Sequence, residues 1–298
     1  MKPAAFEYLR PTSLDEALEA LHRHRDDAKI LAGGQSLVPL LNFRMLRPAM
    51  LIDINGLEEL QVLRVDDGGA LRIGALTRHV TLETSALVRE RFPVLGEAVR
   101  HVAHLAIRNR GTIGGSLCHA DPAAELPMMM VLLDARLHTR STAGSRVHPA
   151  EEFFEGPLMS AIEEDEILTG IEVPPLPAGA GWAFEEFSQR SGDFAIAAVA
   201  AIVELREGTV AEMRLAAMGV GPTPLRLHAV EEALVGQPLT EAAIRDAAAH
   251  ARQEVDPETD LKASADYRRH LVEALTERCL EVAGARAAGT PAAAGVDA

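Results

Sequence analysis

The apolar positions in the first part of the chain switch between helical and extended spacing. Apolar residues recur every three or four positions from Leu14 to Leu21, which predicts one buried face of a helix. Ser13 and Glu16 give the start of this helix the spacing of a capping box. Short apolar runs predict strands at 28–31 and 50–54, and Ser36 is expected to cap a short helix through Leu41.

The middle of the chain carries a predicted hairpin and two predicted helices. Asp66-Asp67-Gly68-Gly69 is a turn sequence between two apolar runs. Met128 to Met130 are expected to fill the core, because methionine adapts to irregular gaps. The predicted elements are strands at 61–65, 70–74, 136–139 and 167–173, and helices at 93–104 and 123–133.

A proline- and glycine-rich segment at 174–181 predicts a linker. Three strands are expected after it, at 182–188, 194–205 and 210–218, and the turn Glu207-Gly208 indicates a meander. Residues 194–205 are rich in alanine and are also compatible with a helix; the turn that follows favours a strand. Helices are predicted at 240–254 and 264–283, followed by a disordered Ala/Gly-rich tail from Gly284.

Two glycine pairs, at 33–34 and 114–115, each follow an apolar segment, and the segments that contain them end in a hydroxyl residue, Ser36 and Ser116. Glycine permits backbone conformations closed to other residues and leaves room for a ligand. Successive amides in such a turn can bind an anion such as a pyrophosphate. Two such segments in one chain predict a large phosphate-bearing cofactor that the protein contacts from two sides.

Charge and composition narrow the class of partner. Asp and Glu outnumber Lys and Arg by 44 to 29, for a net charge of −15, which disfavours nucleic acid and anionic membranes. No apolar run approaches the ~20 residues that a membrane-spanning helix needs. The N-terminus lacks the apolar core of a signal peptide, so a cytoplasmic protein is expected.

The chain has only two cysteines, Cys118 and Cys279, far apart in sequence. An iron–sulfur cluster usually takes four cysteine ligands, so the chain alone cannot hold one of the ordinary type. His101 and His104 could share a face of the helix predicted there, but no neighbouring carboxylate or cysteine completes a metal site. No metal ligand and no acid–base or nucleophilic set is therefore expected.

Common nucleotide and hydrolase motifs are missing. The sequence contains no Gly-x-Gly-x-x-Gly, no Gly-x-x-x-x-Gly-Lys and no Gly-x-Ser-x-Gly. A phosphate-bearing cofactor must therefore be bound by a fold other than the Rossmann or P-loop type.

Several stretches resemble one flavoprotein family. Residues 28–37 and 107–116 resemble the two FAD pyrophosphate loops of the flavoprotein subunits of molybdenum hydroxylases, and residues 121–127 extend the second match. Further similarity covers 6–14, 166–168, 190–195 and 264–271, and so nearly the whole chain. The chain is identified by this resemblance as a medium subunit of the carbon monoxide dehydrogenase and xanthine dehydrogenase type.

The resemblance implies an α+β fold. A two-lobed FAD-binding domain of the vanillyl-alcohol oxidase type would hold FAD between its lobes, followed by a C-terminal domain of a three-stranded sheet and helices. The implied boundaries are lobes at 1–56 and 57–173 within a domain at 1–173, a linker at 174–181, the C-terminal domain at 182–285 and a disordered tail at 286–298.

The resemblance also implies the FAD-binding residues. The first loop would wrap the phosphates through backbone amides, the second would contact the pyrophosphate and ribityl region, and the acidic residue after it would contact FAD hydroxyls. Ile167 and Leu168 would lie at the edge of the isoalloxazine ring. The implied positions are Lys29, Ile30, Leu31, Ala32, Gly33, Gly34, Gln35, Ser36, Leu37, Val102, Thr112, Gly114, Gly115, Ser116, Glu125, Ile167, Leu168 and Phe194.

Three positions bear on how FAD is held. Ser116 stands where the family usually has Asn, and Glu186 stands where many relatives carry Lys near the flavin. A carboxylate does not favour an anionic reduced flavin as a lysine does. Phe194 matches an often aromatic position that can cover the isoalloxazine ring; the alternative is a core residue of a strand.

The implied function is electron transfer. Electrons would pass from a molybdenum cofactor in a large subunit, through two [2Fe–2S] clusters in a small subunit, to FAD in this chain and on to an external acceptor. Such complexes are often dimers of heterotrimers. The alternative is a free-standing FAD oxidoreductase of the same fold. The substrate is chosen by the molybdenum subunit and stays open, as does the acceptor.

Overall fold

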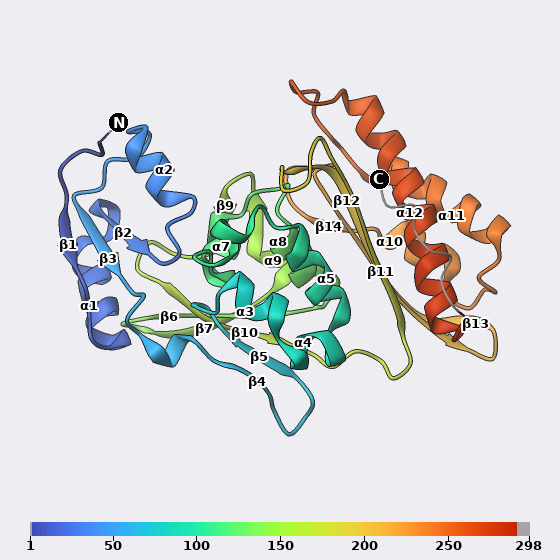
Figure 1. Ribbon diagram of the computed structural model, residues 1–298, viewed down its shortest axis with the longest axis horizontal. Coiled ribbons are helices and arrows are strands. Elements are labelled where there is room, and N and C mark those ends of the chain that lie inside the picture. The colour runs from blue at the N-terminus through green and yellow to red at the C-terminus, as the bar shows by residue number, and fades with distance from the viewer. Residues whose placement is uncertain (1, 291–298) are drawn as a thin grey trace. The chain divides into compact units, whose positions relative to one another are not determined.

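The computed structural model describes residues 2–290 of the 298-residue chain (Figure 1). Two compact units are present. Unit 1 comprises 1–84, 104–120 and 134–174, and unit 2 comprises 85–103, 121–133 and 175–298. Helices and sheets are mixed in both, which confirms the expected α+β character; the vanillyl-alcohol oxidase type of the lobes stays a prediction.

Unit 1 begins with a three-stranded parallel sheet covered by helix α1 (Leu14–His24). The predicted cap is confirmed, because the Ser13 hydroxyl accepts a hydrogen bond from the Glu16 amide at 3.2 Å. The Glu16 carboxylate reaches the amide of Thr12 at 2.7 Å rather than that of Ser13. The sheet order is β1 (Glu7–Leu9), β3 (Met50–Asp53), β2 (Ala28–Leu31).

A five-stranded antiparallel sheet forms the rest of the unit 1 framework. Its hairpin turn is the predicted one, in which Asp66 Oδ1 accepts hydrogen bonds from the amides of Gly68 and Ala70, both at 3.0 Å. One edge strand escaped prediction because its side chains are mostly exposed and carry no apolar pattern. The order is β4 (Leu63–Val65), β5 (Leu71–Gly74), β10 (Ile167–Val173), β6 (Arg136–Ser141) and β7 (Gly144–Pro149).

Short elements connect these sheets. They are α2 (Leu37–Asn42), α3 (His79–Thr84), α6 (Leu105–Arg108), α7 (Ile113–His119), α9 (Ala150–Phe153), the strand pair β8 (Phe154–Gly156) and β9 (Met159–Ser160), and the 3₁₀ turns η1 (Arg25–Asp27) and η2 (Glu58–Leu60).

Unit 2 is built on an antiparallel sheet. The predicted meander is confirmed, and the expected three strands are joined by a fourth of two residues, β14. The alanine-rich strand is buried from Ala195 to Val203 because α12 and α8 both pack against it. Small residues on both faces explain its helix-like composition. The order is β11 (Gly181–Ser188), β12 (Ala195–Arg206), β13 (Thr209–Met218) and β14 (Leu225–Arg226).

Helices cover this sheet (Figure 1). Met128, Met129 and Met130 are fully buried in α8, which confirms their role in the core. The helices of unit 2 are α4 (Ala86–Arg91), α5 (Pro93–His101), α8 (Glu125–Leu132), α10 (His228–Leu234), α11 (Glu241–Glu254) and α12 (Ala265–Ala287).

Two predicted helix ends were wrong. The helix expected to reach residue 104 ends at His101, and Ala103 adopts a positive φ of 42°. His101 and His104 therefore do not share a helix face. The tail expected to be disordered from 284 is helical through Ala287, because Gly284 packs against Leu239 and extends the buried part of α12. Residues 291–298 of that tail lie outside the described part.

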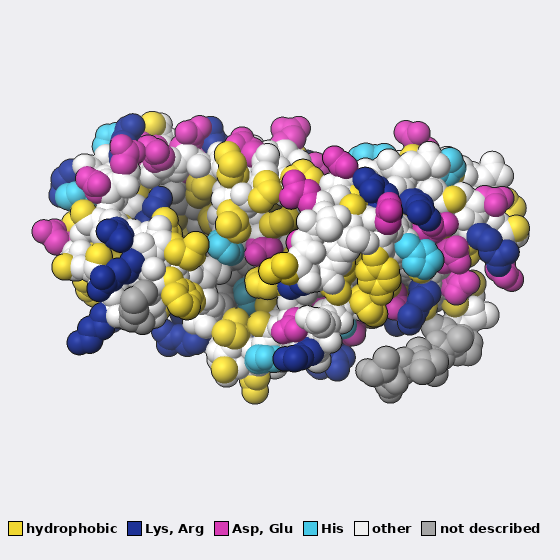
Figure 2. All heavy atoms as spheres, turned by 90° about the horizontal axis from the view of Figure 1, so that it is seen from above, with side chains coloured by type: hydrophobic (Ala, Val, Ile, Leu, Met, Phe, Trp, Pro, Cys, Tyr) yellow, Lys and Arg dark blue, Asp and Glu magenta, His cyan; other side chains and the backbone are white. Residues whose placement is uncertain are grey.

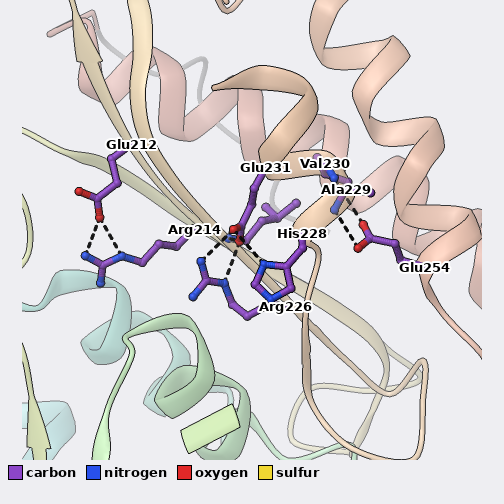
Figure 3. A network of polar contacts seen from close by, with 9 residues as sticks. Glu212, Arg214, Arg226, His228, Ala229, Val230, Glu231 and Glu254 are labelled. Atoms are coloured by element: carbon purple, nitrogen blue, oxygen red, sulfur yellow. Dashed lines mark hydrogen bonds and ion pairs between the residues drawn. The ribbon is translucent and has the colours of Figure 1, made fainter. Parts of the chain in front are cut away.

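A polar network holds β14 against its neighbours (Figure 3). The Arg226 guanidinium forms two parallel bonds to Glu231, from Nε at 2.7 Å and from Nη2 at 2.9 Å. Glu231 Oε1 also accepts the amide of Leu215 at 2.7 Å, and the Glu254 carboxylate accepts that of Ala229 at 2.9 Å. A bidentate pair of this kind fixes geometry as well as adding stability.

Charged side chains of both signs lie on the surface of the protein. Acidic and basic side chains are interspersed on the face shown in Figure 2, without a continuous basic stripe. Within residues 2–290, no helix has both the length and the apolar character to cross a membrane.

Candidate cofactor-binding site

The first glycine segment is an open turn between β2 and α2. Gly34 has a φ of +72°, a left-handed conformation that favours glycine. No hydrogen bond within residues 2–290 engages the amides of Gly33, Gly34, Gln35 or Ser36. Four neighbouring amides are thus available to a ligand.

Ser36 does not cap α2 as expected. Its φ of −99° and ψ of −46° are helical, and its hydroxyl accepts no bond from the following turn. A capping side chain needs an extended backbone at that position. The exposed Ser36 hydroxyl is therefore not used in holding the helix.

The second glycine segment is the start of a helix rather than an open turn. Thr112 is the N-cap of α7, and its Oγ1 accepts the Gly115 amide at 3.2 Å. Gly114 and Gly115 have no positive φ. The amides of Ile113 and Gly114 donate to the carbonyls of Thr77 and Ala75, at 3.0 and 2.9 Å. The expected concavity of free amides is absent here.

Gly114 is required by packing. A Cβ on it would lie 2.7 Å from both the Cβ and the carbonyl oxygen of Ala75. Gly115 is exposed and Ser116 is half-buried, so these two residues present the accessible side of the segment.

The two segments touch at Gly33. A Cβ there would lie 2.6 Å from the carbonyl oxygen of Arg110 and 2.9 Å from Cα of Gly111. Contacts this short do not occur between a real Cβ and backbone atoms, so only glycine fits between the two chain segments.

Asn55 and Arg78 tie the segments together through hydrogen bonds. The Asn55 amide nitrogen donates to the Ala32 carbonyl at 2.7 Å. Arg78 donates to Asn55 Oδ1 at 2.6 Å and to the carbonyl of Arg110. The sequence reasoning missed both residues; only the position of Asn55 directly after a buried strand could have suggested a role.

A cavity of about 420 Å³ opens beside the first segment. Its lining includes Gly33, Gly34, Asp53, Asn55 and Arg110. Burial alone would raise the pKa of Asp53, but hydrogen bonds from Tyr8 and Asn55 outweigh it and hold that pKa below its usual value. Free amides and a guanidinium suit phosphate, and an ionised carboxylate suits sugar hydroxyls.

The other predicted positions divide between the units. Ile167 and Leu168 lie in β10 of unit 1 and are 2% and 3% exposed. Val102 follows α5 and Glu125 begins α8, both in unit 2. Their contact with FAD stays a prediction.

Phe194 precedes β12 and is 53% exposed, so the reading of it as a core strand residue was wrong. The Lys262 ammonium lies 5.8 Å from the centre of its ring. An exposed aromatic face of this kind is available to a planar partner.

Two carboxyl groups of unit 2 are buried, and the charge of His101 offsets only part of the effect of burial on their pKa values. Burial raises the pKa of Glu125 to about 8 and that of Glu186 to about 7. Glu186 Oε2 has no hydrogen-bond partner within the described range, and the nearest ring nitrogen, His101 Nδ1, is 4.0 Å away.

Metal sites are absent from the part of the chain that the structure covers. No group of three or more His, Cys, Asp or Glu side chains converges there. Cys118 and Cys279 are unpaired, and burial raises the pKa of the Cys118 thiol to about 12.

Family models match both parts of the chain. Residues 4–176 match the FAD binding domain in molybdopterin dehydrogenase, and residues 182–283 match the CO dehydrogenase flavoprotein C-terminal domain. The chain belongs to the FAD-binding medium-subunit family of molybdenum hydroxylases. It is an oxidoreductase subunit of that family.

Individual members of the family match over nearly their whole length. Caffeine dehydrogenase subunit beta of Pseudomonas sp. (strain CBB1) is 43% identical over 96% of this chain and 97% of its own. The 6-hydroxypseudooxynicotine dehydrogenase complex subunit alpha of Paenarthrobacter nicotinovorans is 45% identical over 97% and 98%. A carbon monoxide dehydrogenase structure from Hydrogenophaga pseudoflava superposes with a TM-score of 0.93 at 40% identity, over 96% and 99%.

Proposed function

We propose that this flavoprotein subunit binds FAD and relays electrons from the [2Fe–2S] clusters of a partner subunit to an external acceptor. The observation that carries the proposal is the first glycine segment, in which Gly33, Gly34 and Gln35 have free amides and line a cavity of about 420 Å³. A chain with two separated cysteines needs its iron–sulfur centres in another subunit.

The residues present fit FAD. Residues 29–37 would hold the phosphates through the free amides of the first segment. Gly115 and Ser116 would contribute surface contacts, since the amides of residues 113–116 bond within the chain, and the buried Thr112 and Gly114 would hold the segment in place. Val102, Glu125, Ile167, Leu168 and Phe194 complete the proposed set. Asn55 and Arg78 would keep the two segments in register.

FAD, when bound, supplies the redox chemistry, because its ring accepts electrons singly or in pairs. The chain positions the FAD and determines the charges around it. In unit 2, one oxygen of the buried Glu186 carboxyl has no hydrogen-bond partner among the described residues, and the Phe194 ring is exposed. No acid–base set for an organic substrate is proposed in this chain.

We further propose a large molybdenum-cofactor subunit and a small iron–sulfur subunit as partners, in a dimer of heterotrimers. The relatives' names support this, since they are a medium chain and lettered subunits of dehydrogenase complexes. The domain boundaries at 173 and 182 are part of the same proposal and agree with the ranges of the two family models.

Flavin content tests the proposal. The purified chain should show flavin absorption at one FAD per 31.9 kDa chain. Gly33→Val should lose FAD, because the side chain would push the two segments apart. Absence of flavin after incubation of folded wild-type chain with FAD would contradict the proposal. Oxidation of an organic substrate by the isolated FAD-loaded chain would instead support a free-standing oxidoreductase.

A further inference from the structure

The cavity of unit 1 lies at the carboxyl ends of two parallel strands. Strands β2 and β3 pair in parallel, and their register places Leu31 opposite Asp53, the last residue of each strand. The first glycine segment follows β2 directly, so Asp53 comes to lie beside it. All residues that line the cavity belong to unit 1. In open α/β sheets, ligands commonly bind outside these strand ends.

One part of the cavity suits an anion. Gly33, Gly34 and Gln35 have free backbone amides and line the cavity. The Gln35 side chain donates from Nε2 to the Gly33 carbonyl at 2.9 Å, which fixes the turn without using those amides. Arg110 also lines the cavity, and its guanidinium makes no hydrogen bond or ion pair to any residue from 2 to 290. Amide donors beside an unpaired guanidinium attract phosphate oxygens.

Asp53 gives the cavity a carboxylate that is held in place. Its Oδ2 accepts the hydroxyl of Tyr8, and its Oδ1 accepts the Asn55 backbone amide at 3.0 Å and Asn55 Nδ2 at 2.6 Å. A carboxylate has about four acceptor positions, so these three bonds leave one for a ligand. Burial alone would raise the pKa of Asp53, but the hydrogen bonds outweigh it and keep the group ionised at neutral pH.

Asn55 lines the same cavity, but its side chain is fully used within the protein. Its Nδ2 donates to the Ala32 carbonyl at 2.7 Å as well as to Asp53. Its Oδ1 accepts from Arg78 at 2.6 Å. An amide nitrogen carries two hydrogens, so Nδ2 has none left for a ligand. Of these two neighbours, Asp53 is therefore the one with capacity for a ligand.

The rest of the lining suits a planar base. The side-chain amide of Asn42, the last residue of α2, makes no hydrogen bond to any residue from 2 to 290. An amide presents a donor and an acceptor side by side, the combination that pairs with the N6 and N7 edge of adenine. The aliphatic residues of the lining are Leu31, Val38, Pro39 and Ile107.

The combination of charges selects the ligand. The negative charge of Asp53 repels a free phosphate or pyrophosphate ion from the nearby amides. A hydroxyl group on the same ligand reverses this effect, because it donates a charge-assisted hydrogen bond to the carboxylate. A ribose that joins a base to a diphosphate has hydroxyls and anionic oxygens in one molecule. The cavity thus has the chemistry of an ADP site rather than that of a simple anion site.

We propose that the cavity of unit 1 binds the ADP half of FAD, with Asp53 accepting a hydrogen bond from the ribose hydroxyls and Arg110 pairing with the pyrophosphate. This inference rests on the proposed function. Both residues determine specificity, because they recognise the half of FAD that FMN lacks.

Isothermal titration calorimetry on the flavin-free, full-length chain tests the assignment. The probes are ADP, 2′,3′-dideoxy-ADP and inorganic pyrophosphate. Loss of the two ribose hydroxyls should weaken binding about tenfold, which corresponds to one hydrogen bond to a charged group. This comparison needs no variant of the protein. Equal affinities of wild-type protein for ADP and dideoxy-ADP would overturn the role of Asp53.

Asp53→Asn separates ligand binding from support of the fold. It should bind ADP about tenfold more weakly and should no longer distinguish ADP from dideoxy-ADP. It should bind pyrophosphate about threefold more tightly, because the repulsion is gone. A purely structural role would weaken the binding of both ligands and contradict the assignment. Asp67→Asn, at an exposed position of the hairpin turn, is the matched control and should behave as wild type.

Arg110→Gln should weaken the binding of ADP and of pyrophosphate by the same factor, about tenfold, because both contain the diphosphate. Arg64→Gln, a change at an exposed arginine of β4 outside the cavity lining, is the control and should bind both as wild type does. Unchanged pyrophosphate binding by Arg110→Gln would remove Arg110 from the site.

The inference and the proposed function can fail separately. FMN should not displace ADP, because it has no adenosine. If the wild-type chain binds FAD but binds no ADP, or if FMN displaces ADP, the cavity does not hold the ADP half and the proposed function still stands. If the folded wild-type chain binds no FAD, the proposed function itself is contradicted.

Discussion

The two glycine segments have similar sequences and different backbone structures. The pair at 33–34 forms an open turn with a left-handed Gly34 and four free amides, whereas the pair at 114–115 begins a helix whose amides bond within the protein. Glycine is needed in both because backbone passes close by, at Arg110 in one and at Ala75 in the other. A glycine pair thus predicts a close approach but not whether a ligand or the protein itself makes it.

The largest expected effect is on the stability of the fold at acidic pH and comes from His79. This residue is adjacent to the second glycine segment and donates its backbone amide to the Gly111 carbonyl at 3.0 Å. Burial lowers the pKa of its ring from 6.5 to about 4. The unfolded chain binds a proton there at higher pH than the folded chain, so stability falls as pH drops from 6.5 to 4. The loss is about 3 kcal/mol by linkage.

Urea unfolding at the two ends of this window measures the effect. His79→Phe and His79→Gln should each lose less stability on acidification than wild type does. His104→Gln, a change at an exposed histidine, should behave as wild type. An equal loss of stability on acidification in all four proteins would show that protonation of His79 does not cause it.

Gly114→Ala should destabilise the fold by about 2 kcal/mol, because the new methyl group meets the Ala75 backbone. Gly96→Ala is the control, a helical glycine whose added Cβ would meet nothing closer than 3.6 Å. That change should stabilise by about 0.5 kcal/mol. Thermal unfolding separates the two, and equal effects would refute the packing role of Gly114.

Gly114→Ala also tests whether the two glycine segments differ in their contribution to FAD binding. The fraction of Gly114→Ala that folds should still bind FAD, while Gly33→Val should lose FAD even where it stays folded. Flavin content per folded chain, from absorbance and circular dichroism together, decides this. Equal loss of flavin in both variants would make the two segments equivalent and contradict the contrast.

The smallest expected effect on stability comes from removing the side-chain hydroxyl of Thr112 or of Ser36. Thr112→Ala removes the cap of α7 and should cost about 1 kcal/mol, whereas Thr112→Ser should retain it. Ser36→Ala removes no capping bond and should change stability by less than about 0.5 kcal/mol. Chemical denaturation of the three variants measures the difference; similar costs for Thr112→Ala and Ser36→Ala would show that both helices are capped alike.

Local patterns predicted local structure well. The Ser13 cap, the Asp66 turn and the meander after residue 181 depend on neighbouring residues, so the sequence contained what determines them. The alanine-rich strand was harder, because burial on both faces removes the polar alternation that marks most strands.

Long-range contacts could not be predicted in the same way. The amides of residues 113 and 114 bond to Thr77 and Ala75, which no local pattern announces. Asn55 and Arg78 join segments that are distant in sequence, and α12 extends past residue 283 because Leu239 packs on Gly284. The close packing at Gly33 and Gly114 could thus be predicted from the glycine pairs, while the side chains that support the two segments could not.

The central claim is that this subunit receives electrons from a partner and passes them on. Anaerobic stopped-flow spectroscopy of the FAD-loaded chain, mixed with substrate in the presence and absence of the molybdenum and iron–sulfur subunits, tests it most directly. The account predicts bleaching of the flavin band only when both partners are present, after reduction of the clusters. Rapid bleaching by substrate with no partner present would contradict it.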